Sequence, residues 1–267
     1  MGKIDIEYTP AKPPEFRQLY LNALLEPQEF FLERLVAVGK CYEFSSSGSG
    51  SLGYLVVHES KIVELFINQP DVLVTRAVLL ESVKNLGASA IYVKSFDPLA
   101  MALESLISTE KQLSGYLFRA YSRNSGPKSE LLKSSPLEEN EIDQVMEIND
   151  NFFDNAEEIR HYIESQADHV FSYRDLKGNL IGCGITSRVI EGRAAVDIGM
   201  LVAPEHRMKG YGKTIIEDLK EFCIGMGDSP IAGCDAANIA SKKTLEAAGF
   251  KATHQLYEYP LTGLEWK

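Results

Sequence analysis

The sequence predicts a mixed α/β fold in two successive domains, and three observations lead to that prediction. Strand-like and helix-like segments alternate along both halves of the 267-residue chain. The regular patterns stop at residues 124–127, Asn-Ser-Gly-Pro, and resume after them. The order of the elements also repeats between the halves. We therefore place one domain at residues 1–124 and a second at 128–267.

The first half contains four helical and five strand-like segments. The predicted helices cover residues 14–23, 27–40, 71–86 and 98–108, and the predicted strands cover 41–46, 54–58, 61–67, 90–94 and 116–121. The polar stretch SSSGSGS at residues 45–51 separates two short β-like runs, so we expect a flexible hairpin connection there.

The second half continues the alternation, and local signals mark the ends of its helices. Helices are predicted over residues 136–149, 155–165, 211–226 and 238–248, and strands over 129–134, 170–173, 180–190, 194–202, 230–234 and 251–259. Pro136, followed by acidic residues, is typical of a first helical turn, and Asp154 or Asn155 can cap the next helix. Gly249 suits the position just after the last helix.

Short segments of the two halves resemble each other in the same order. The pairs are IVELFINQP (62–70) with AVDIGMLVAP (195–204), VLLESVK (78–84) with TIIEDLK (214–220), and IYVKSFD (91–97) with IAGCD (231–235). Self-similarity of this kind indicates an internal repeat, so the two domains are expected to share one scaffold.

Composition narrows the class of partner. The net charge of −11 argues against nucleic acid, because phosphate binding needs a basic surface. An acidic surface favours a cationic amine, although solubility alone also explains it. No apolar run approaches the ~20 residues of a membrane helix, and the first residues, MGKIDIEYTP, lack the apolar stretch of a secretory signal. We expect no membrane partner; the oligomeric state is not readable.

The four cysteines are widely spaced and form no CxxC pair. We therefore expect neither a disulfide framework nor a metal site, and reduced thiols indicate a cytoplasmic protein. Cys183, Cys223 and Cys234 each lie in an apolar stretch, which favours core packing over a nucleophilic role.

The segment LVAPEHRMKGYGK at residues 201–213 contains the motif that points to a ligand-binding function. A predicted strand ends at Val202, a loop with Arg207-x-x-Gly210-x-Gly212 follows, and a helix begins near Tyr211. First-turn N–H groups of a helix lack intrahelical partners and can converge on one anion, which the helix dipole also attracts. Glycines let a backbone approach a phosphate closely. The loop is therefore a candidate phosphate cradle.

This loop and a second motif resemble those of the GNAT superfamily of acetyl-CoA-dependent N-acyltransferases, whose signature is Q/R-x-x-G-x-G/A after the fourth strand. The second motif is a strand followed by a helix that begins with Asn238 and Ser241 and ends in Gly249-Phe250. The resemblance implies a GNAT fold for residues 128–267, and a shortened GNAT-like copy for residues 1–124.

The resemblance also implies roles for individual residues. The set expected to hold acetyl-CoA is Leu201, Val202, Arg207, Met208, Lys209, Gly210, Tyr211, Gly212, Lys213, Asn238 and Ser241. Within it, the Val202 N–H would polarise the thioester carbonyl, and the loop amides would grip the pyrophosphate. Asn238 and Ser241 would touch the pantetheine arm or the phosphates.

The proton-transfer groups are less well marked. Asp197, on the strand that leads to Val202, is the candidate base for the attacking amine; alternatively it is a solvent-facing residue or a salt-bridge partner. Leu245 stands where many family members carry a tyrosine that protonates the leaving thiolate. The general acid would then be absent, be water, or come from the last strand, where Tyr257 and Tyr259 are candidates.

The first half lacks the phosphate loop. At the equivalent position it reads PDVLVT (70–75), which is shorter and has no glycine, and Asp71 would repel a phosphate. We interpret this half as a scaffold without a cofactor site that helps to shape the acceptor pocket. An unrelated α/β domain remains the alternative.

The predicted activity is transfer of an acetyl group from acetyl-CoA to a primary amine of a small molecule or peptide, by direct attack and without a metal. A non-catalytic CoA-binding sensor or interaction module is the alternative. The identity of the acceptor and the preferred acyl chain are not readable from the sequence.

Overall fold

The computed structural model describes residues 6–11, 16–46, 50–107, 110–123, 132–165 and 167–263. The chain divides into two compact units: unit 1 is Met1–Tyr116 with His254–Lys267, and unit 2 is Leu117–Thr253. The C-terminal residues, which we placed in the second domain, thus group with the first half. The predicted boundary at 124–127 lies outside the described residues and stays a prediction.

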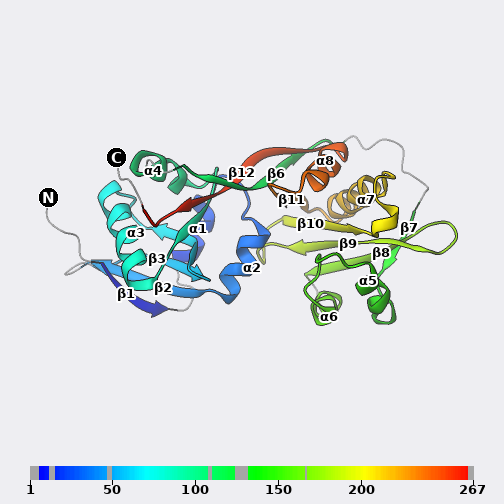
Figure 1. The fold of residues 1–267 in the computed structure, drawn as a ribbon, viewed down its shortest axis with the longest axis horizontal. Coiled ribbons are helices and arrows are strands. Elements are labelled where there is room, and N and C mark those ends of the chain that lie inside the picture. Colours follow the sequence, from blue (N-terminus) through cyan, green and yellow to red (C-terminus); the bar gives the residue numbers. More distant parts are fainter. Residues whose placement is uncertain are drawn as a thin grey trace. The chain divides into compact units, whose positions relative to one another are not determined.

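Unit 1 has a mostly antiparallel sheet in the order β1-β2-β3-β4-β5-β12. Figure 1 labels β1, β2, β3 and β12 among these strands. Its strands are β1 (Ile6–Ala11), β2 (Lys40–Ser46), β3 (Ser51–His58), β4 (Lys61–Ile67), β5 (Ala90–Lys94) and the end of β12 (Phe250–Pro260). Its helices are α1 (Phe16–Ala23), α2 (Phe30–Val38), α3 (Val72–Leu86) and α4 (Pro98–Leu106). Strand β6 (Gln112–Tyr121) has residues in both units.

The end of β12 belongs to unit 1 because it completes that unit's sheet and core. Residues Leu256–Pro260 pair antiparallel with β5, in the register Tyr257↔Val93. The buried side chains of Tyr259 and Leu261 join a cluster that includes Ile62, Leu79 and Leu103. Burial of this apolar surface stabilises the docked strand. The chain therefore needs its C-terminus to finish its N-terminal unit.

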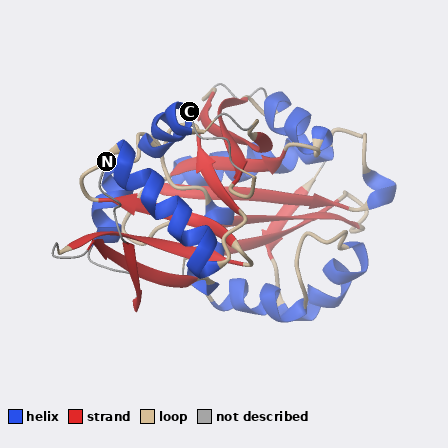
Figure 2. Cartoon of the chain, turned by 60° about the vertical axis from the view of Figure 1, so that its left-hand side comes forward, coloured by secondary structure: helices blue, strands red, loops and turns tan. Residues whose placement is uncertain are grey.

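In unit 2 the strands follow the order β6-β11-β10-β9-β8-β7, with parallel and antiparallel pairs. Its strands are β7 (Lys133–Pro136), β8 (Asp168–Arg174), β9 (Leu180–Arg188), β10 (Ala195–Val202) and β11 (Ser229–Asp235). Its helices are η1 (Glu139–Glu141), α5 (Ile142–Ile148), α6 (Ala156–Glu164), η2 (Pro204–His206), α7 (Tyr211–Gly225) and α8 (Ile239–Ala247). Figure 2 distinguishes helices and strands by colour.

Helices cover both faces of the unit 2 strands. Apolar side chains of α5 and α6 form one buried cluster with Cys183 and Ile185 of β9 and Leu201 of β10. Helix α7 packs on the opposite face, where a Cβ added to Gly184 would lie 3.0 Å from Leu219 Cδ1. Gly184 therefore permits the close approach of helix and strand.

Most predicted elements are confirmed within a few residues, including the Asn155 cap of α6 and the left-handed Gly249 after α8. Strand β1 was missed. Its sequence IEYTPA carries a proline and weak alternation, and its strand conformation comes from pairing with β2. The predicted helix over 136–149 begins later, in the short helix η1. No helix within the described residues is long and apolar enough to span a membrane.

A buried lysine provides a test of the packing in unit 2. Lys220 on α7 is 1% exposed, and its Nζ donates to Ala248 O at 2.9 Å and Ser122 O at 3.2 Å. Lys220→Met should lower the free energy of unfolding by about 2–4 kcal/mol, because the buried carbonyl of Ala248 and the partly buried carbonyl of Ser122 lose a charged donor. Chemical denaturation of the full chain would measure this loss. The exposed Lys243→Met is the control, and equal stability of both variants would contradict the assignment.

Candidate active site

The central feature of unit 2 is a pair of parallel strands that diverge. Within the described residues, β10 pairs with β11 only over Ala195–Asp197, although β10 continues to Val202. On its other edge β10 stays paired with β9 as far as Val202↔Gly182. After Asp197, the edge of β10 that faces β11 is thus no longer paired with that strand. Such an edge carries backbone donors and acceptors that a ligand can pair with.

Val202 presents its backbone to that open edge. Ala203 N donates to Ile181 O at 2.9 Å, so Ala203 faces β9. Backbone groups alternate along an antiparallel pair, so the N–H and C=O of Val202 face away from β9. The carbonyl accepts from Arg207 Nε at 3.2 Å. The geometry is thus compatible with the carbonyl-polarising role predicted for the Val202 N–H, a role that stays a prediction.

The loop after β10 leads into the N-terminus of α7. Gly210 is the N-cap of α7, with φ of 85°, and Met208 also has positive φ at 59°. Thr214 N donates to Gly210 O at 3.3 Å, which starts the helical bonding. The N–H groups of the preceding residues in the first turn have no intrahelical acceptor and face the loop. This confirms the predicted strand–loop–helix context, and the loop can receive an anion.

Gly212 brings α7 close to its neighbours. A Cβ at this position would lie 3.0 Å from Met200 Cε and 3.2 Å from Thr244 Cγ2. The two motif glycines therefore do different work: Gly210 adopts a left-handed backbone conformation, and Gly212 leaves room for β10 and α8.

The Arg207 side chain points to protein partners. Besides Val202 O, its guanidinium contacts Asp150 Oδ2 at 2.9 Å. Asp150 lies in the loop between α5 and α6, so Arg207 links the end of β10 to that loop. Both side chains are about half exposed, at 45% and 58%, so the ion pair itself contributes about 1 kcal/mol at most. No residue pattern along the chain indicates this contact.

The α5–α6 loop covers the face of β10 that carries Asp197. A Cβ on Gly199 would lie 3.1 Å from Phe152 Cζ, so the phenyl ring rests on the glycine. Asp197 is two residues earlier in the same strand and therefore faces the same side. Asn149 holds the loop: its Oδ1 accepts from Phe152 N and Phe153 N, each at 3.0 Å. An acceptor reaching Asp197 would meet Phe152.

Other predicted site residues have different surroundings. Asn238 Oδ1 accepts from Ser241 N at 3.0 Å, so these two cap α8, and a contact with acetyl-CoA stays a prediction. Leu245, in the position of the family tyrosine, is 3% exposed and belongs to the core. Tyr257 lies on the part of β12 that belongs to unit 1, outside the unit that holds Gly210 and Asp197.

The buried cysteines are core residues. Cys183 and Cys223 are free thiols in the interior, and burial raises the pKa of each to about 12. Thiolate is the nucleophilic form, so neither side chain is set up for nucleophilic attack at neutral pH. This agrees with the packing role expected from their apolar surroundings.

Comparison with known families identifies the scaffold. Residues 138–250 match the acetyltransferase (GNAT) family, and residues 13–121 match an acetyltransferase (GNAT) domain. The chain belongs to the GNAT acetyltransferase family. It is a tandem GNAT protein and an acyltransferase, and acetyl-CoA is the family's acyl donor. The predicted internal repeat is thereby confirmed.

Solved structures share this tandem fold. A GNAT-family acetyltransferase from Colwellia psychrerythraea superposes with a TM-score of 0.80 and 16% identity, over 96% of this chain and 99% of its own. A tandem GNAT protein from the clavulanic acid biosynthesis pathway gives a TM-score of 0.57 and 10% identity, over 98% and 100%. These TM-scores show a common fold. No curated protein sequence matches this chain.

The proposed phosphate cradle can be tested by introducing a negatively charged side chain into it. Gly210→Asp should weaken binding of CoA roughly 10- to 1000-fold, since a carboxylate near a phosphate costs about 1–4 kcal/mol at surface dielectric. Titration calorimetry with CoA would measure the dissociation constant. Gly178→Asp is the control, because Gly178 also has positive φ, of 90°, with nothing within 4 Å of its added Cβ. An unchanged affinity in Gly210→Asp would contradict the assignment.

Proposed function

We propose that unit 2 transfers the acetyl group of acetyl-CoA to a primary amine of a small molecule or peptide by direct attack. The observation that carries this proposal is the convergence on one strand. The end of β10 bears the open edge at Val202, the cradle follows it, and Asp197 lies on the face under the α5–α6 loop. The donor would thus bind at the open edge of β10, and the acceptor would approach it from the face that carries Asp197.

Each residue has a defined task in this reaction. The Val202 N–H would hold the thioester carbonyl oxygen as negative charge develops on it. The amine nitrogen forms the new bond to the carbonyl carbon, the carbon–sulfur bond breaks, and Asp197 accepts the amine proton. The thiolate takes its proton from water, because Leu245 cannot donate one. Loop and strand would supply orientation as well as charge stabilisation.

The acceptor is expected to be cationic before it reacts. The chain carries a net charge of −11, and Asp197 lies on the face of β10 under the α5–α6 loop. A negative surface raises the local concentration of ammonium compounds. A panel of polyamines, amino acids, aminoglycosides and peptides with free amino termini, assayed by release of CoA thiol, tests the proposal. CoA binding without turnover on any amine would instead support the sensor.

Asp197→Asn tests the base. For any amine that is turned over, this variant should lower kcat/KM roughly 100- to 10,000-fold, because the general base is lost. The dissociation constant for CoA should stay unchanged, since Asp197 faces away from the cradle. Asp143→Asn, on the exposed surface of α5, is the matched control. If both variants kept full kcat/KM, Asp197 would be only a structural residue.

A further inference from the structure

Unit 1 repeats the divergence of two parallel strands. Within the described residues, β4 pairs with β5 only at Lys61↔Ala90 and Ile62↔Ile91. Strand β4 then continues to Ile67 and β5 to Lys94. The same arrangement in unit 2 leaves the open edge at Val202. The repeat thus gives unit 1 the framework of a second site.

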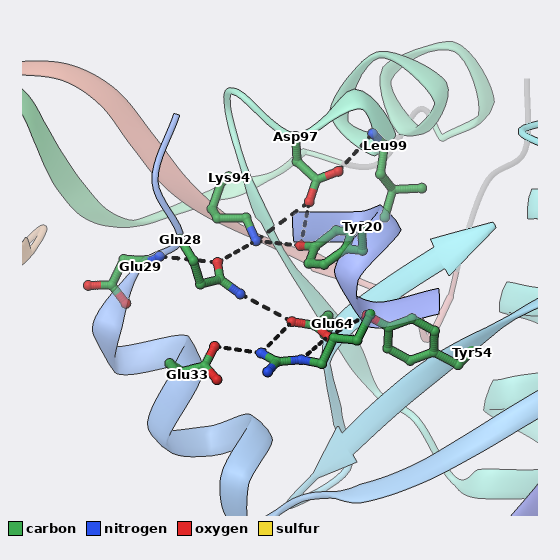
Figure 3. Close-up of polar contacts among 10 residues, drawn as sticks. Tyr20, Gln28, Glu29, Glu33, Tyr54, Glu64, Lys94, Asp97 and Leu99 are labelled. Carbon is green, nitrogen blue, oxygen red and sulfur yellow. Dashed lines mark hydrogen bonds and ion pairs between the residues drawn. The ribbon is translucent and has the colours of Figure 1, made fainter. Parts of the chain in front are cut away.

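In unit 1 a side-chain amide bridges the diverging strands. Gln28, just before α2, donates from Nε2 to Glu64 Oε2 of β4 at 3.1 Å (Figure 3). Its Oε1 accepts from Lys94 Nζ of β5 at 2.9 Å. The three residues are only 3%, 1% and 1% exposed. The space between the strand ends is therefore filled by the chain itself.

Glu64 is the counterpart of Asp197. Both are the acidic residue of the repeated strand segment, in IVELF and AVDIG. Glu64 Oε1 accepts from Arg17 Nε at 3.0 Å and from the Tyr54 hydroxyl at 2.7 Å. In unit 1 the guanidinium of Arg17 thus binds Glu64, the carboxylate that corresponds to Asp197, the proposed base of unit 2.

In unit 1 the helix N-terminus that corresponds to the cradle is also occupied, by a side chain of the same unit. Helix α3 follows β4 as α7 follows β10, and its N-cap is Asp71. Asp71 Oδ1 accepts from Leu73 N at 2.8 Å and from Val74 N at 3.1 Å. The first-turn amides that would face a phosphate are bound to a carboxylate, where unit 2 has Gly210 instead.

The buried charges of unit 1 are matched to partners. Lys94 Nζ also donates to the Tyr20 hydroxyl and lies 3.6 Å from Asp97 Oδ2, and Asp97 Oδ1 accepts from Leu99 N at 3.0 Å. Arg17 pairs with Glu33 as well as with Glu64. A buried network in which the groups are satisfied is costly to open, because each displaced group would be left unpaired.

We infer that unit 1 is a self-occupied copy of the site: Asp71 takes the place of a phosphate, Arg17 takes that of an acceptor cation, and Gln28 with Lys94 closes the space between the strands. The protein then binds one equivalent of CoA, in unit 2. This stoichiometry rests on the proposed function of unit 2, whereas the closure of unit 1 rests on its own contacts.

Counting bound CoA separates the two claims. Titration calorimetry of the full chain with CoA should give one equivalent, and the double variant Gly210→Asp/Gly212→Asp should bind none. Two equivalents in the unaltered chain, of which one persists in the double variant, would overturn the self-occupied state of unit 1 and leave unit 2's chemistry standing. A single equivalent that persists in the double variant would overturn both the self-occupied state of unit 1 and the cradle in unit 2. Absence of binding to the unaltered chain would overturn the proposed function and, with it, the predicted stoichiometry.

Removing the bridge tests the structural role of Gln28. Gln28→Leu should lower the thermal midpoint by ~4 °C or more, because Glu64 and Lys94 each lose a buried partner. The dissociation constant for CoA should change by less than about twofold, because Gln28 belongs to unit 1 and the proposed cradle belongs to unit 2. Gln18→Leu, on the exposed side of α1, is the control and should change neither quantity. A tenfold weaker CoA affinity in Gln28→Leu, with an unchanged midpoint, would show that unit 1 takes part in binding.

Discussion

The structure depends on how the backbone edge of a diverging parallel strand is satisfied. Once β10 separates from β11, or β4 from β5, polar groups on that edge need other partners, because buried polar groups left unpaired are costly. Unit 2 meets this requirement in part with Arg207, which binds the Val202 carbonyl. In unit 1 the side chains of Gln28, Glu64 and Lys94 bridge the two separated strands. One geometric constraint, inherited by both copies, thus has two outcomes.

The two helix N-termini show the same contrast in electrostatic terms. A helix beginning attracts negative charge, and that charge can come from a ligand or from the chain. Asp71 supplies it internally to α3, whereas α7 begins at a left-handed Gly210 that has no side chain to do so. A single residue type at one capping position therefore distinguishes a closed copy from one that can receive an anion.

The sequence predicted much of this because the signals are local. Glycines at 210 and 212, the capping residues and the apolar periodicity of α7 depend on neighbours a few residues away. The features that the sequence did not predict depend on partners that are distant along the chain. Strand β1 exists because β2 lies beside it, and the contact of the Phe152 ring with Gly199 joins residues that are distant in sequence.

Residue type and spacing along the chain were enough to predict the tandem repeat, the family and a loop suited to an anion. Three features emerged from the three-dimensional contacts: the C-terminal strand completes unit 1, Leu245 is a core residue, and Arg17 and Gln28 occupy the counterpart of the candidate active site. The difference lies in the sequence distance over which each interaction acts. Capping and periodicity act within a few residues, whereas strand pairing and buried charge networks join side chains that are distant in sequence, as in the 66-residue separation of Gln28 and Lys94.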